Sequence, residues 1–424
     1  MCTAALGAGC ATRGPQAPAV SRRTFDVGGS AVRGVAGDLT RTFAALSHGH
    51  ANTSIEARWA RGSVQGFAWE TKLEGAAGPL ASAGSLVAVA VTATNTAGGG
   101  PVIGEPGAAV IGLDRDRGTV RWRAPLDASE WVIVTSIAAT SDAVLVSGSF
   151  SGSLRIGNHT VSSAGNSDGF VAKLTTTGAT TWVVRAGGLG ADSIQGVAST
   201  GHRIAIAGVF APGAELRGHP FESIEPKVPF ADGFVAELDD TGARRWSASF
   251  GSKLDDAVAG VTIDGAGRVA VAATVRDAVQ IGGAQLQTRG GSDGLVGWWS
   301  AEGSSLHAVL IGGDEPDGLQ AIAAAGDRLV VAGYFSGTMP LGDRSLTAGG
   351  GDDAFLAALD DRGSVLTSWQ VGGDGREEVA AMSSVPGGVV AGIAHTAGAT
   401  IAHTTLASPA DPMTGAALIV LPVP

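Results

Sequence analysis

Thiols are nearly absent from this chain of 424 residues, because its two cysteines, Cys2 and Cys10, both lie at the very start. The rest of the chain therefore cannot form disulfides or cysteine-ligated zinc sites. Long apolar runs are missing too. The longest, at residues 86 to 93, has the length of a strand and falls far short of the ~20 residues that cross a bilayer. The sequence predicts no transmembrane segment.

Positive charge is also scarce, since 28 Lys and Arg residues stand against 39 Asp and Glu residues and leave a formal net charge of −11. Proteins that bind nucleic acid normally present a clustered basic face, so we expect no nucleic-acid partner. The signature motifs of serine hydrolases, zinc metalloproteases and P-loop proteins do not occur in the sequence. It therefore indicates no catalytic residue.

Glycine, by contrast, is abundant. The chain contains 66 glycines, roughly twice the usual ~7% share, and each glycine inside a helix costs about 1 kcal/mol relative to alanine. Hydrophobic residues make up 44% of the chain and charged residues only 16%, which excludes a disordered protein. The composition predicts an all-β protein built from strands and tight turns.

A repeat of about sixty residues organises the chain. The segments at 147 to 152, 206 to 210, 271 to 275 and 331 to 337 are similar to one another. Each is followed by a short apolar turn unit that ends in glycine and then by a strand that begins with aspartate. From glycine to aspartate the spacing is 11 residues in three copies (157 to 168, 282 to 293, 342 to 353) and 14 in the fourth (218 to 232). Four short strands per repeat are typical of a propeller blade.

Seven copies of the second strand can be found, near residues 43, 88, 145, 206, 270, 331 and 390. The last copy lacks a fourth strand, and the segment at 24 to 29 has the form of that strand. We therefore predict a seven-bladed β-propeller of four-stranded antiparallel blades over residues 21–424, preceded by a disordered tether or signal remnant at 1–20. The N-terminal strand would complete the last blade through about five hydrogen bonds and the burial of Phe25 and Val27.

Two family resemblances rest on these motifs. The GG-x-x-x-D step and runs such as DGFVAKL at 168 and DGFVAEL at 232 resemble the bacterial SBBP β-propeller repeats over residues 130 to 375. That resemblance implies a propeller and no particular activity. The segments at 111 to 122 and 236 to 246 look like the AxDxxTGxxxW motif of PQQ-type propellers. In that motif the aspartate and threonine stabilise a turn, and the tryptophan packs between blades.

Carboxylates are expected on one face of the ring, because the loops from strand two to strand three and the linkers between blades open on the same side. The loops contribute Asp168, Asp232, Asp293 and Asp353, and the linkers contribute Asp192, Asp255 and Asp317, with Glu377 in the last copy. Two interpretations stay open. The carboxylates bind a cation, for which calcium is the candidate, or each accepts backbone N–H groups in its own repeated turn. We expect no other cofactor.

Histidines point to the same face in this prediction. His48, His50, His159 and His219 all fall between second and third strands, and His48 and His50 have a spacing that suits a metal. They are either ligands or solvated loop residues. The loop at 212 to 232 is the longest in the regular blades, and functional contacts concentrate in loops on rigid scaffolds, so we expect partner contacts there.

These observations predict a monomeric, non-catalytic binding or scaffold protein that takes a protein or carbohydrate ligand through one loop face. The alternative is an enzyme that works at the central face, either similar to a quinoprotein dehydrogenase or a sugar-active hydrolase or lyase. The segment at 6 to 10 resembles the end of a bacterial lipoprotein signal, which places the protein in the cell envelope or outside the cell. Cys10 is then a lipid anchor or, in the other interpretation, a free cysteine in a tail.

Overall fold

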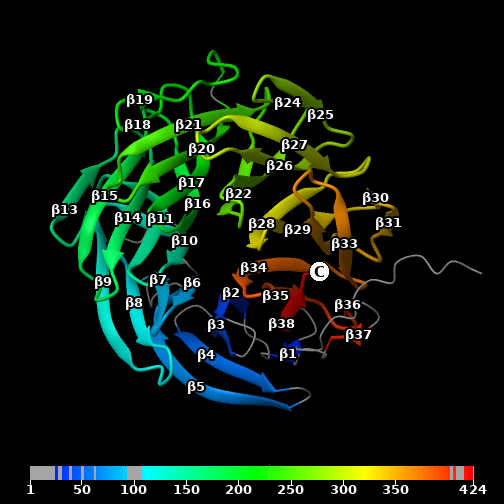
Figure 1. Cartoon of the computed structure of the whole chain (residues 1–424), viewed down its shortest axis with the longest axis horizontal. Helices are drawn as coiled ribbons and strands as arrows, with labels where there is room; N and C mark the ends of the chain where they lie inside the picture. The colour runs from blue at the N-terminus through cyan, green and yellow to red at the C-terminus, as the bar shows by residue number, and fades with distance from the viewer. Residues whose placement is uncertain are drawn as a thin grey trace, which may run out of the picture.

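The computed structural model describes residues 24–26, 31–37, 41–48, 52–61, 64–92, 107–228, 230–401, 404–406 and 415–423. Every regular element in these ranges is a β-strand. The strands form seven antiparallel sheets arranged around a central axis, and one hairpin forms a separate two-stranded sheet (Figure 1). The protein is a seven-bladed β-propeller, which confirms the predicted fold class.

Each blade has four strands in chain order from the axis outward, and only the last blade departs from this order. The first three blades consist of β2–β5 (Ala31–Gly37, Arg41–His48, Asn52–Arg61, Val64–Glu74), β6–β9 (Ala76–Ala83, Leu86–Thr92, Gly107–Asp114, Val120–Ala128) and β10, β11, β14 and β15 (Trp131–Ala139, Ala143–Ser151, Asp168–Thr175, Thr180–Gly187).

The next three blades repeat this plan. They consist of β16, β17, β20 and β21 (Ser193–Thr200, Arg203–Phe210, Asp232–Asp239, Arg244–Gly251), β22, β23, β26 and β27 (Ala257–Ile263, Val269–Val275, Asp293–Trp299, Ser305–Ile311) and β28, β29, β32 and β33 (Gly318–Ala325, Arg328–Phe335, Asp353–Leu359, Val365–Gly372).

Blade 7 joins the two ends of the chain. Its strands are β34 (Glu378–Val385), β35 (Gly388–His395), β38 (Gly415–Pro422) and the N-terminal β1 (Thr24–Asp26). Thr24, Phe25 and Asp26 lie opposite Ile419, Leu418 and Ala417, so the first strand completes the last blade (Figure 1). This confirms the predicted closure, although the described strand has three residues and Val27 lies outside the described residues.

The apolar turn units of the repeat are β-hairpins, a feature that the sequence did not predict. They are formed by β12 and β13 (Ser153–Ile156, His159–Ser162), β18 and β19 (Glu215–Leu216, His219–Pro220), β24 and β25 (Ala278–Ile281, Ala284–Gln287), β30 and β31 (Thr338–Leu341, Arg344–Thr347) and β36 and β37 (Thr400–Ile401, Thr404–Thr405). In four cases the hairpin pairs with the outermost strand of the preceding blade and makes a six-stranded sheet. The hairpins thereby cover strand edges that four-stranded blades would leave open.

Tryptophans tie each of four blades to the next. The indole Nε1–H of Trp69, Trp122, Trp182 and Trp246 donates to the carbonyl oxygens of Arg115, Thr176, Asp240 and Ala301 at 3.0, 2.8, 3.0 and 3.0 Å. Each acceptor lies in the turn between the third and fourth strands of the following blade. The tryptophan and turn therefore play the structural role that the PQQ-type motif implies.

Candidate functional site

Four pairs of acidic residues lie on one face of the ring, where the third strand of one blade begins and the linker to the next blade passes. Burial and sequence spacing define the pairs as Asp168 with Asp192, Asp232 with Asp256, Asp293 with Asp317, and Asp353 with Glu377. All eight residues are buried. The predicted gathering of these carboxylates is thus present in the structure, but they do not form an exposed ring.

The acid that pairs with Asp232 lies one position after the predicted Asp255. The linker acid of blade 4 is Asp256, which is 5% exposed, whereas Asp255 points to solvent and accepts the N–H of Ala231 at 2.9 Å. The physical reason lies in Gly251, five residues before Asp256. A Cβ at Gly251 would lie 2.5 Å from Oδ1 of Asp232 and 2.8 Å from Oδ2 of Asp256, so the glycine lets the two acids approach each other.

The carboxylates close their own turns. The third-strand aspartates accept the N–H group four residues earlier, from Ala164 to Asp168 (3.0 Å), Arg289 to Asp293 (2.9 Å) and Gly349 to Asp353 (3.2 Å). The linker aspartates do the same, from Gly188 to Asp192 (2.6 Å), Ser252 to Asp256 (2.7 Å) and Gly313 to Asp317 (2.5 Å). This pattern is the repeated turn that one of the two sequence interpretations describes.

The linker acids also reach forward into the following blade. Oδ1 of Asp192 accepts the N–H of Ala211 at 2.7 Å, and Oδ1 of Asp317 accepts the N–H of Ser336 at 3.1 Å. Ala211 and Ser336 follow the second strands β17 and β29 of the next blades. Each of these acids therefore bonds both to its own linker and to the next blade.

Burial raises the pKa values of five of these acids. Desolvation raises the pKa of Asp256 to about 7 and that of Asp317 to about 6, and in both cases the charge of the partner aspartate adds to the effect. Desolvation also raises the pKa values of Asp192, Asp232 and Asp353. Asp256 and Asp317 are thus able to hold a proton near neutral pH, and both accept backbone N–H groups.

The cation interpretation gains little from this geometry. Each pair has only two carboxyl groups, whereas calcium takes 6–8 oxygen ligands. One oxygen each of Asp168, Asp293, Asp353 and Glu377 is buried without a hydrogen-bond partner in the described part of the chain, and most of the other oxygens of the pairs accept hydrogen bonds. Within the described ranges, no group of three or more His, Cys, Asp and Glu residues is placed to hold a metal ion. The geometry supports the turn interpretation.

The histidines do not gather with the aspartates as predicted. His48 ends β3 on the loop face, and His50 and Cys10 lie outside the described residues. His159 and His219 begin the second strands of hairpins that turn away from that face. Near His159, the hairpin glycine Gly157 lies against Thr180, at the opposite end of β15 from the aspartate pair. The prediction failed because it treated these hairpins as open loops.

Exposed apolar side chains mark part of the loop face, and the sequence prediction missed them. Leu189, Phe230 and Leu254 are 82%, 37% and 40% exposed. Phe230 ends the long blade 4 loop and Leu254 lies in the next linker. These two segments are joined by the bond from Ala231 N–H to Asp255 and by the Asp256 N–H bond to the Ala231 carbonyl at 3.0 Å. The sequence does contain a sign that these leucines are exposed. At the corresponding positions, the linker after blade 5 has the charged residues Asp314 and Glu315.

The long loop of blade 4 is held firmly in place. The ring of Phe221 stacks on Phe234 at 4.5 Å between centroids and lies 4.9 Å from Phe210. The hydroxyl of Ser223 and the N–H of Ile224 donate to Oδ2 of Asp232 at 2.7 and 2.9 Å. Asp232 and the phenylalanines thereby fix the loop that carries Phe230.

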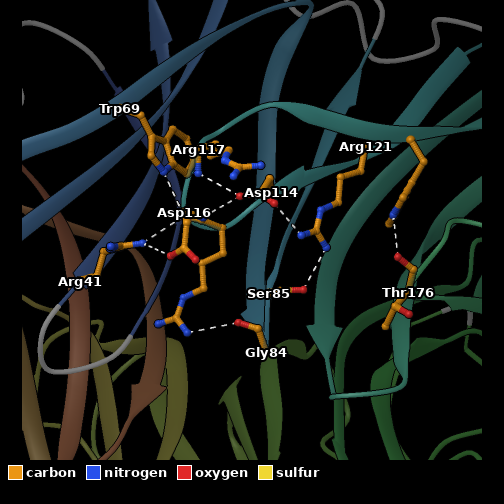
Figure 2. A network of polar contacts seen from close by, with 11 residues as sticks. Arg41, Trp69, Gly84, Ser85, Asp114, Asp116, Arg117, Arg121 and Thr176 are labelled. Carbon is orange, nitrogen blue, oxygen red and sulfur yellow. Dashed lines mark hydrogen bonds and ion pairs between the residues drawn. The ribbon is translucent and has the colours of Figure 1, made fainter.

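A polar network joins blades 1 to 3 at the opposite ends of the strands (Figure 2). Arg121 pairs with Asp114 at 2.6 Å and lowers the pKa of that carboxyl. Arg41 pairs with Asp116, also at 2.6 Å. A hollow of about 290 Å³ beside Arg121 is partly lined by Trp122. Because most of these polar groups bond to neighbouring turns, the network connects adjacent blades and is structural.

No protein-family model and no curated protein sequence matches the chain, so the resemblance to SBBP repeats is not confirmed in that way. Within the described residues there is no helix long and apolar enough to cross a membrane.

Among solved structures, the chain is similar to BamB from Moraxella catarrhalis (15% identity, 92% of this chain and 85% of that chain covered, TM-score 0.43). It is also similar to a europium-containing methanol dehydrogenase (12% identity, 95% and 93%, TM-score 0.39). A third is the β-propeller domain of the trilobed protease from Pyrococcus furiosus (9% identity, 93% and 94%, TM-score 0.46). Because these TM-scores are below 0.5, the propeller assignment rests on the seven sheets themselves.

Proposed function

We propose that this protein is a non-catalytic binding or scaffold propeller that contacts a protein partner through the loop face of blades 3 to 5. The observation that carries the proposal is the exposure of Leu189, Phe230 and Leu254 on that face. The other exposed large apolar side chains of the described residues, Val120, Leu306 and Leu366, lie at the starts of fourth strands, at the opposite ends of the blades. Apolar anchors on an exposed surface, surrounded by polar residues, are typical of interaction sites.

The surroundings of these residues support a protein ligand. Lys253 and Asp255 flank Leu254 and are exposed, which gives the apolar residues a polar rim. The long loop is pinned by Phe221 and Asp232, so little conformational entropy is lost when a partner binds. Burying three such side chains contributes about 1.5–3 kcal/mol each at full burial, which is enough for the core of an interface.

The composition of the central strands favours the same proposal over the enzyme alternative. A catalytic site at the axis needs ionisable groups that converge from several blades. The seven innermost strands, β2, β6, β10, β16, β22, β28 and β34, supply Arg33 and Glu378 and otherwise uncharged residues. Small and aliphatic residues dominate these strands.

The cellular location is a further part of this proposal. A thiol-free ring closed by strand pairing suits an oxidising compartment, and the lipoprotein-like segment ending at Cys10 would tether the ring to a bacterial envelope. We infer a monomeric propeller that is held at the envelope or secreted. Mass spectrometry of the protein from its native host would show a diacylglycerol adduct on Cys10 if the tether is a lipid.

Site-specific photo-crosslinking in the native host tests the binding surface. A photoreactive amino acid would replace Phe230 or Leu254, and the control would replace Val120, which is 53% exposed at the start of β9, away from the loop face. We expect one protein to be captured by both loop-face positions and not by the control. The second variant Leu189→Asp should weaken that capture. Capture that is equal at Val120, or absent at both loop-face positions, would contradict the proposal.

A further inference from the structure

The hairpin formed by β18 and β19 has an arginine at a turn position where three equivalent hairpins, here called its sister hairpins, have a glycine. The backbone conformation at that position is left-handed in all four hairpins. Arg217 has φ 56°, and the equivalent residues Gly157, Gly282 and Gly342 have φ 58°, 55° and 66°. A side chain in this left-handed region costs roughly 1–2 kcal/mol. Strain of this kind is concentrated at ligand-binding and other functional positions.

The position also faces a second arginine. In the sister hairpins, a Cβ on the glycine would come within 2.9 Å of Thr180, 2.2 Å of Ser305 and 2.9 Å of Val365. Each of these residues begins the fourth strand of its blade. In blade 4 the residue that begins the fourth strand is Arg244. Arg217 and Arg244 therefore come together at one place in the fold where the other blades have a glycine and a small or apolar residue.

These two arginines share an open hollow of about 410 Å³ with His219, Thr241 and Ala243. Nε of Arg217 donates to the carbonyl oxygen of Gly242 at 3.2 Å, and Nη1 of Arg244 donates to the hydroxyl of Ser247 at 3.0 Å. The Nε of Arg244 is buried and has no acceptor. The nearby turn acid Asp239 is occupied by the N–H and hydroxyl of Thr241.

Neither arginine has a carboxylate partner within the described residues. Other arginines of the protein do have one: Arg121 with Asp114 at 2.6 Å, Arg185 with Asp168 at 2.5 Å, Arg203 with Glu237 at 2.5 Å, and Arg268 with Asp264 at 2.7 Å. Two guanidinium groups without a carboxylate partner repel each other, and an anion between them would relieve this repulsion.

We propose that Arg217, Arg244 and His219 form a binding site for a tetrahedral oxyanion, the phosphate or sulfate group of a small ion or of a larger molecule. Planar guanidinium groups bind such oxygens in pairs of charge-assisted hydrogen bonds. The buried Nε of Arg244 is the donor that such an oxygen would satisfy. The hollow is open to solvent, so it accommodates an anionic group that projects from a larger ligand. This site is separate from the loop face and does not depend on it.

Isothermal titration of the full chain with inorganic phosphate and with sulfate, at fixed ionic strength in chloride, tests the site. Wild type is expected to bind at least one of the two ions. Arg217→Gly restores the glycine of the sister hairpins, so we expect its melting temperature to stay equal or rise. Its affinity for the ion should fall about tenfold or more, because charge-assisted hydrogen bonds to the ion are lost. Arg244→Gln is expected to show the same loss of affinity.

Arg155→Gln is the matched control, because Arg155 lies on the sister hairpin strand β12 and pairs with Asp127 at 2.5 Å. It is expected to bind like wild type. O-phosphoserine and glucosamine 6-sulfate distinguish the sources of the group. Tighter binding of one ester than of its parent ion identifies a larger ligand of that class, and equal binding identifies the free ion. The proposal is overturned if wild type binds neither ion at ~10 mM, or if Arg217→Gly binds as tightly as wild type.

Discussion

The indole of Trp246 packs directly on Gly303 of the following blade. A Cβ built on Gly303 would lie 2.6 Å from Cγ and from Cδ2 of that ring, closer than any side chain allows. The same contact recurs where Trp69 meets Gly118, Trp122 meets Gly178 and Trp182 meets Gly242. Each of these glycines also has a positive φ. At these four junctions, neighbouring blades are therefore joined by an indole ring that packs flat against a glycine of the next blade.

Gly303→Ala should destabilise the protein more than Gly283→Ala does. Both glycines have a positive φ, 89° and 82°, but nothing lies within 4 Å of a Cβ at Gly283. Gly283→Ala therefore carries only the backbone strain, about 1–2 kcal/mol. Gly303→Ala also pushes Trp246 out of place, which adds about 1–3 kcal/mol and brings the total to roughly 2–5 kcal/mol. Urea unfolding of the two variants measures the difference. Equal losses would show that the Trp246 contact adds nothing to stability.

Spacing along the sequence predicted the blades because each strand pairs with its neighbours in the same repeat. The DGFVAEL strand from Asp232 and the closing strand at Thr24 could be placed from the repeat alone. The direction of the hairpins could not, because Leu216 pairs with Ala186 of the preceding blade, and no pattern inside one repeat records that partner. For this reason His159 and His219 were placed on the wrong face.

The sequence also predicted the face of the candidate site, because its aspartates recur at the same position of each repeat. Recurrent aspartates indicated a shared face, but exposure depends on neighbours that only the folded ring brings together. Asp255 and Asp256 are adjacent and chemically identical, and only the approach of Asp232 over Gly251 selects Asp256 for burial. The cluster of Arg217 with Arg244 was also missed, because Arg217 lies in the turn between β18 and β19 while Arg244 begins β21, and only the folded hairpin brings them together.

Stability should fall as the pH rises from about 4 to about 7, in part through Asp256. The ordinary aspartate pKa is 3.8 and burial raises that of Asp256 to about 7. In this window the folded state holds a proton that the unfolded state has released, so raising the pH favours unfolding. At 1.36 kcal/mol per pKa unit, the loss is up to about 4 kcal/mol. Urea unfolding between pH 4 and pH 8 measures it.

The matched variants are Asp256→Asn and Asp255→Asn. An amide resembles the protonated acid, so Asp256→Asn should flatten the pH dependence, whereas the exposed Asp255 should leave it unchanged. Asp317, whose pKa burial raises to about 6, contributes a smaller change of the same sign. If both asparagine variants keep the slope of wild type, Asp256 does not control this pH dependence.

A disulfide between β1 and β38 should stabilise the ring. Asp26 lies directly opposite Ala417, and opposed residues in antiparallel strands have Cα separations of ~4.5–5.5 Å, which suit a disulfide. With Cys2 and Cys10 changed to serine, the variant Asp26→Cys/Ala417→Cys closes nearly the whole chain into a loop. We expect oxidation to raise stability by ~3–5 kcal/mol. Comparing oxidised and reduced forms of the same variant by thermal unfolding removes the effect of the substitutions. A reduced form as stable as the oxidised one would mean that the strand pairing does not limit unfolding.

Calcium should leave the melting temperature unchanged. Both oxygens of Asp317 accept backbone N–H groups, Oδ2 from Gly313 and Oδ1 from Ser336. A calcium ion bound there would have to displace these bonds. A ligand at a hundred times its Kd adds about 2.7 kcal/mol of stability, which a thermal scan with millimolar CaCl₂ against EDTA readily detects. If the melting temperature rises with calcium in wild type and not in Asp317→Asn, the carboxylates bind the cation and the turn interpretation is wrong. An unchanged melting temperature in both proteins is the result that the geometry predicts.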